Sequence, residues 1–147
     1  EHYQATCEKI DKWLFNDFYH PQLRTISPLL YQLCRKYIRK FGRQGRRNPD
    51  AADKKLTALQ ESLYSKIPDV DKILNRYYEY YLLTDFLEIY EDYSFSKHLL
   101  FGIVKTHLLR LFITLYAEDR ETVKLKEIAT VIAVFEQRAQ RIYSSIS

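Results

Sequence analysis

Residues 99–116 read LLFGIVKTHLLRLFITLY, an almost wholly apolar segment. Wound as a helix, its apolar side chains cover nearly the whole circumference, so the pattern predicts a buried helix with neighbours on several sides. The segment is about as long as a membrane span. However, Lys105, His107 and Arg110 interrupt its middle, where charge is costly in lipid. We therefore expect this helix to be the centre of a soluble bundle.

The composition around this segment favours one all-α domain. The chain has 147 residues, 46% of them hydrophobic, which is enough to bury a single core without disulfides or metals. Three Gly and four Pro are few helix breakers for this length, and no internal repeat is visible. The expected fold, over residues 1–147, is a single-domain bundle of about six helices with a central apolar helix.

Apolar residues at helical spacing, together with caps and breakers, predict where the helices begin and end. In chain order, we expect helices over about 3–18, from Ser27-Pro28 to Gly42, from near Asp50 to Ile67-Pro68, from Asp69 or Asp71 to Tyr90, from a cap at Ser94 or Ser96 to Tyr116, and over 128–146. The stretch GRQGRRNPD at 42–50 predicts a mobile loop, and residues 117–122 an exposed connection.

The strongest charge feature is a basic block of seven cations within thirteen positions, with no acid among them. Cations are favoured at a helix C-terminus, so a solvated helix end is one interpretation. A binding site for phosphates or for an acidic partner is the other, although no known nucleic-acid-binding motif accompanies the charge. The basic block consists of Arg35, Lys36, Arg39, Lys40, Arg43, Arg46 and Arg47.

The helix expected from residue 69 is rich in tyrosines and acids. Its tyrosines suit a core edge, with the ring buried and the hydroxyl outside, more often than a recognition cage. Asp85 and Glu88 share a helix face, as a general acid and base would, yet ordinary surface charge explains the spacing. Tyr77, Tyr80 and Asp85 join the basic block as candidate partner-binding residues. The acids Glu79, Asp85, Glu88, Glu91 and Asp92 could pair with the basic block within the fold.

Cysteines and histidines form no complete site. Cys7 and Cys34 lack a CxxC partner and are expected as small buried thiols, with a disulfide between them as the alternative in an oxidising compartment. His107 is expected as a neutral imidazole bonded to a polar neighbour, and a ligand or proton shuttle is the alternative. GxxxxGK[ST], GxGxxG, GxSxG and HExxH are absent from the sequence. We assign no catalytic residue and no metal site.

From Asp71 onward, the order of helices resembles the C-terminal helical region of bacterial flagellin lysine-N-methylases. That family has an aromatic helix of the type LxxYxxxYL, then an apolar helix with a Lys or His step before Leu-Leu, then a helix ending in Phe, a polar pair and an aromatic residue. The matching segments cover about half the chain. They are ILNRYYEYYLLTDFL, HLLFGIVKTHLLRLFITLYA and KEIATVIAVFEQRAQRIY.

The resemblance implies a noncatalytic role for this chain. In the family, an N-terminal Cys-rich portion is thought to carry an iron–sulfur cluster and to transfer methyl groups from S-adenosylmethionine to flagellin lysines. Clusters need several closely spaced thiolates, which Cys7 and Cys34 do not provide. The chain starts Glu1-His2-Tyr3 without an initiator Met, so we expect a fragment of a longer protein, with a processed protein as the alternative. The resemblance implies that the fragment is C-terminal. It would be cytoplasmic, hold no cofactor of its own, and bind flagellin or the parent's N-terminal domain.

Two alternatives come from other classes of protein. A small helical nucleic-acid-binding protein would use the basic block and would bind with a steep salt dependence. A plain protein-interaction bundle could be secreted, with Cys7 joined to Cys34. No membrane association is expected.

Overall fold

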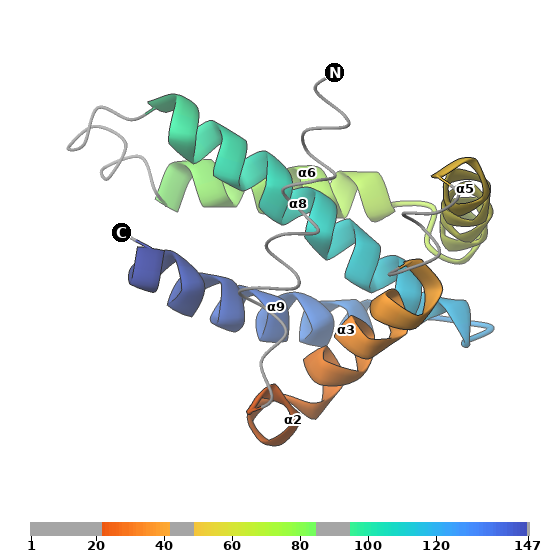
Figure 1. Ribbon diagram of the computed structural model, residues 1–147. Helices are drawn as coiled ribbons and strands as arrows, with labels where there is room; N and C mark the ends of the chain where they lie inside the picture. Colours follow the sequence, from red (N-terminus) through yellow and green to blue (C-terminus); the bar gives the residue numbers. More distant parts are fainter. Residues whose placement is uncertain (1–21, 42–48, 85–94, 147) are drawn as a thin grey trace.

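The computed structural model describes residues 22–41, 49–84 and 95–146, which form six helices and no strand (Figure 1). This confirms the predicted all-α bundle. The helices are α2 (Leu23–Ile26), α3 (Pro28–Phe41), α5 (Pro49–Lys66), α6 (Val70–Thr84), α8 (Phe95–Glu118) and α9 (Leu125–Ile146).

Local signals account for most of these boundaries. Pro28 opens α3, where its fixed φ suits the first turn and its missing N–H is not needed. The Ile67-Pro68 step follows the last residue of α5, as predicted. At the start of α9, the Lys124 N–H donates to Glu127 Oε2 over 3.0 Å, the second half of a capping box. The expected helix over 3–18 and most of the 42–50 loop lie outside the described residues.

One prediction about the elements needs correction. The exposed connection was placed at 117–122, but Ala117 is buried and α8 continues to Glu118. Two further features were not predicted. One is the single turn α2, because four residues are too few to show a helical period. The other is the start of the last helix at Leu125, three residues before Ile128, where its apolar pattern begins. The tyrosine helix α6 is described only as far as Thr84, so its predicted end at Tyr90 is not tested.

α8 is the central helix, as its apolar circumference predicted. In Figure 1 it runs between α6 and α9, with α3 and α5 near its C-terminal end, and it packs against all four of these helices. The Phe112 and Phe135 rings meet edge to face, with centroids 5.8 Å apart, and join α8 to α9. The fully buried side chains of α8 include Leu108, Leu109, Phe112, Ile113 and Leu115.

A glycine sets the distance between α8 and the tyrosine helix α6. A Cβ atom built on Gly102 would lie 2.6 Å from Tyr81 Cε1 and 2.8 Å from Tyr78 Cε2. No real Cβ tolerates such contacts, so the two aromatic rings can rest on the α8 backbone only because this residue has no side chain. Gly102 therefore fixes the position of Tyr81 beside Lys105, the next polar residue along α8.

Candidate functional site

A buried polar cluster joins α6, α8 and α9. Lys105 is only 3% exposed, and its Nζ donates to Glu136 Oε1 over 2.8 Å. The Tyr77 hydroxyl donates to the other carboxylate oxygen, Glu136 Oε2. The ammonium also lies 4.6 Å from the centroid of the Tyr81 ring and 5.5 Å from that of Tyr77. The aromatic cage that the tyrosines build thus holds a lysine of the same chain.

This cluster is a polar unit at the edge of an apolar interface, with its ammonium buried and its carboxylate partly exposed. A buried ammonium is tolerated when a counter-charge and hydrogen bonds replace water, and Glu136 supplies the charge. The carboxylate in turn accepts hydrogen bonds from Lys105, from Tyr77 and, at 3.5 Å, from Gln140 Nε2. Both carboxylate oxygens therefore have donors, and the arrangement holds three helices in register.

A second cluster caps the C-terminus of α8 with three cations, two of them from other helices. The last carbonyl groups of a helix lack partners within it and carry a partial negative charge. Lys36 Nζ from α3 donates to the Leu115 carbonyl over 2.8 Å, and Lys66 Nζ from α5 donates to that of Ala117 over 2.7 Å. Arg120 Nη1 donates to the Tyr116 carbonyl over 2.7 Å and its guanidinium stacks on that ring. This external cap explains why α8 runs past the predicted boundary.

Two lysines of α3 form ion pairs with acids at the end of α8 and just after it. Lys36 Nζ lies 2.6 Å from Asp119 Oδ2 and 3.1 Å from Glu118 Oε2, and Lys40 pairs with Glu118 Oε1. Burial opposes ionisation of Glu118, but hydrogen bonds from Lys40 and Lys36 outweigh it and lower the pKa of this carboxyl group. The hydrogen bond from Lys36 likewise lowers the pKa of Asp119. Two of the four basic-block residues on α3, Lys36 and Lys40, thus form ion pairs within the fold.

A third polar group lies at the α5–α6–α8 junction. Arg110 Nη2 lies 2.6 Å from Asp71 Oδ1, and Arg110 Nη1 donates to the Tyr64 hydroxyl over 2.6 Å. His107, one turn earlier on α8, was expected as a neutral imidazole bonded to a polar neighbour, but the residue is exposed and its ring forms no hydrogen bond among the described residues. The predicted bond is missing because the α8 circumference is not covered equally on all sides. Partial burial of the ring and the charge of Arg110 lower the pKa of His107.

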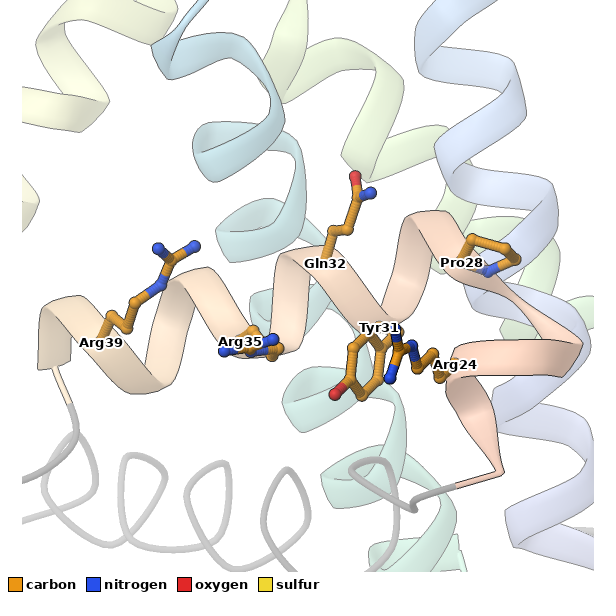
Figure 2. Close-up of a pocket in the computed structure, with 6 residues that line it drawn as sticks. All are labelled: Arg24, Pro28, Tyr31, Gln32, Arg35 and Arg39. Atoms are coloured by element: carbon orange, nitrogen blue, oxygen red, sulfur yellow. The ribbon is translucent and has the colours of Figure 1, made fainter.

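The arginines of α2 and α3 have a different environment from the lysines. Arg24, Arg35 and Arg39 are exposed, and none of them has an acidic partner among the described residues. They line an open hollow of about 440 Å³ on the outer side of α3, together with Pro28, Tyr31 and Gln32 (Figure 2). The Arg35 guanidinium carbon lies 5.9 Å from the centroid of the Tyr31 ring. We name these six residues the arginine hollow.

The structure therefore divides the residues that the sequence singled out. Arg35 and Arg39 face outward, whereas Lys36 and Lys40 are paired within the fold. Tyr80 is 67% exposed on α6, whereas Tyr77 belongs to the Lys105 cluster. Of the acids expected to pair with the basic block, Glu79 is described and is exposed; the lysines pair instead with Glu118 and Asp119. Arg43, Arg46, Arg47, Asp85, Glu88, Glu91 and Asp92 lie outside the described residues.

Two residues of these sites, Arg24 and Glu136, were not predicted from the sequence. Arg24 lies on the unpredicted turn α2, eleven residues before Arg35, and no local spacing links the two. Glu136 was part of an amphipathic helix pattern, and only the packing of α9 on α8 brings it to Lys105. The sequence does contain one signal for this partner: Lys105 lies inside the apolar α8 segment, and a buried charge requires a counter-charge.

Cys34 is a free thiol and fully buried, as its helical pattern predicted. Burial raises the pKa of this thiol to about 12, and the charge of Arg138 acts in the opposite direction. Within the described ranges, no three His, Cys, Asp or Glu side chains gather as a metal site. Nor does any helix there have the length and apolar content needed to cross a membrane.

Comparisons with protein-family models, with curated proteins and with solved structures find no match for this chain.

Proposed function

We propose that this chain is a noncatalytic, partner-binding helical domain of a bacterial protein that resembles flagellin lysine-N-methylase. In this proposal the domain supports the parent's fold and binds flagellin or the parent's N-terminal domain. Methyl transfer would reside in a separate Cys-rich portion with an iron–sulfur cluster and S-adenosylmethionine. The protein would act in the cytoplasm.

One observation carries the proposal: the three segments that resemble the family form one packed unit. Their described residues lie on α6, α8 and α9, and the Lys105 cluster joins these helices through Glu136 and Tyr77. Within the Lys105 cluster the side-chain polar groups are paired with one another, as expected for residues that hold a scaffold together. Arg24, Arg35 and Arg39 on the surface of α2 and α3 have no acidic partner in the described part, which favours binding over chemistry.

The test compares flagellin methylation by the full-length parent and by a parent with a disrupted helical unit. Glu136→Leu would leave Lys105 without its counter-charge and should reduce flagellin lysine methylation, measured by mass spectrometry after co-expression. Glu79→Gln, an exposed site on α6, is the matched control and should leave methylation unchanged. Unchanged methylation after complete removal of this region would contradict the proposal.

A nucleic-acid-binding module is the second candidate, and the outward-facing arginines of the arginine hollow are the observation that favours it. Each phosphate neutralised by an arginine releases counterions, so this function predicts a steep loss of affinity with salt. Electrophoretic mobility of short RNA and DNA at low salt tests it. Absence of any retardation would remove this candidate.

A further inference from the structure

We propose that the arginine hollow binds an extended acidic segment of a partner protein, with carboxylates at alternate positions meeting Arg35 and Arg39. This inference rests on the proposed partner-binding function and names the chemistry of the partner. The lysines and the arginines of α3 differ in their contacts. Lys36 and Lys40 are used within the fold, whereas Arg35 and Arg39, each one position earlier, are not.

The residue type favours carboxylate recognition. A guanidinium presents a planar fork of donors that matches a carboxylate with two parallel hydrogen bonds, and it is more weakly hydrated than an ammonium group. The three exposed guanidiniums of the hollow come from two helices, since Arg24 reaches in from α2 (Figure 2). A ligand with several carboxylates can therefore be held from two directions, which a single solvated helix face would not provide.

The spacing of the arginines favours an extended peptide. Arg35 and Arg39 are one helical turn apart, a rise of about 6 Å along the axis. Alternate residues of an extended chain point to the same side at intervals of about 6.6 Å. Two acidic residues separated by one position could thus meet both arginines without either chain bending.

The aromatic content of the hollow argues against a single-stranded nucleic acid. Such ligands are usually held by several aromatic side chains on which successive bases stack. The hollow contains one aromatic ring, Tyr31, and Arg35 already lies against it. The cation–π contact instead holds the Arg35 side chain in place for an anionic ligand.

The experiment measures binding of labelled peptides to the full chain by fluorescence anisotropy. The probe is a decapeptide of alternating Glu and Ala. The comparison peptide, EEAAEEAAEA, has the same composition but no two Glu separated by one position. The alternating peptide should bind saturably and more tightly than the comparison peptide. A ten-nucleotide oligouridine is the rival probe, and tighter binding of this RNA would overturn the inference.

Charge variants locate the site. Arg35→Gln with Arg39→Gln should weaken peptide binding at least tenfold, whereas Lys54→Gln with Lys55→Gln, which removes the same charge from exposed positions on α5, should change it less than twofold. Arg35→Lys with Arg39→Lys keeps the charge but loses the fork and should bind at least threefold more weakly than the wild type. Three results would each overturn the inference. The first is an equal loss of affinity in the two double Gln variants, the second is wild-type affinity in the double Lys variant, and the third is no saturable binding.

The same variants separate this inference from the proposed function. If the Arg35 and Arg39 Gln pair loses the peptide while the full-length parent still methylates flagellin normally, the acidic-segment site stands and the flagellin role fails. If methylation falls while peptide binding is unchanged, the site assignment fails instead.

Discussion

Lys105 Nζ and Glu136 Oε1 lie 2.8 Å apart and form an ion pair between the middle of α8 and the face of α9. The Lys105 side chain is 3% exposed and that of Glu136 is 26% exposed, so water reaches the carboxylate but hardly the ammonium. The rings of Tyr77 and Tyr81 from α6 also lie beside the ammonium group. This pair therefore couples the central helix to two neighbours through a charge that cannot return to solvent without opening the bundle.

Glu136→Gln should destabilise the fold because it leaves the Lys105 ammonium buried without a counter-charge. We expect a loss of about 2–3 kcal/mol in the free energy of unfolding, below the usual range for fully buried pairs because Glu136 is partly exposed. Urea denaturation followed by circular dichroism measures it. The control Glu79→Gln should lie within about 0.5 kcal/mol of the wild type.

Replacing both partners tests whether the pair itself stabilises the protein. Lys105→Met with Glu136→Leu removes both charges and should lie within about 1 kcal/mol of the wild type, because apolar groups of similar volume avoid the desolvation penalty. The same urea titration applies. A double variant as unstable as Glu136→Gln alone would show that the tyrosine contacts, rather than the uncompensated charge, dominate.

Gly102→Ala should lower the thermal midpoint of unfolding. Ala has the better helix propensity, by about 1 kcal/mol, but its Cβ would meet the Tyr81 and Tyr78 rings at the distances given above. Overpacking of this kind usually costs about 1–3 kcal/mol, so a net loss is expected. Asn75→Ala at an exposed site of α6 reports propensity alone and should not lower the midpoint. Calorimetry that finds Gly102→Ala more stable than the wild type would contradict the close approach.

The ion pairs at the C-terminus of α8 should make the free energy of unfolding depend on pH in the acidic range. The pKa of Glu118 is lowered from its ordinary value of 4.5, so its contribution is fully present above that value and is lost as pH falls through the folded-state pKa. Glu118→Gln should cost about 1–2 kcal/mol at neutral pH, between the values for surface and buried pairs. The difference from the wild type should shrink in urea titrations below about pH 4. A difference that is constant with pH would refute the ion-pair explanation.

Cys34 should be nearly inert in the folded protein. With the pKa of its thiol at about 12, the reactive thiolate is about three orders of magnitude scarcer near pH 8 than for an ordinary cysteine, and burial also blocks access. In a Cys7→Ser chain, labelling by an aromatic disulfide reagent should be slow in buffer and fast in concentrated urea. Fast labelling of the native chain would mean that α3 opens readily from α9.

Local pattern was sufficient for much of the fold. The start of α3 at Pro28, the end of α5 before Ile67 and the central position of α8 follow from breakers and apolar periodicity, which act over a few residues. The candidate site was harder to predict from sequence, because it depends on which cations remain without partners in the folded protein. Arg35 and Lys36 are neighbours in the same run of charges, yet one faces solvent and the other reaches Asp119, 83 residues later.

Local sequence is enough to specify that this chain is helical, that α3 begins at Pro28, that α5 ends before Ile67 and that α8 is the central helix. These properties follow from steric and hydrophobic preferences of residues close together in the chain. Tertiary packing is needed to bring Glu136 to Lys105, lysines from α3 and α5 to the end of α8, and Arg24 to Arg35 and Arg39. Ion pairs are chosen by distance in space, and packing alone sets that distance.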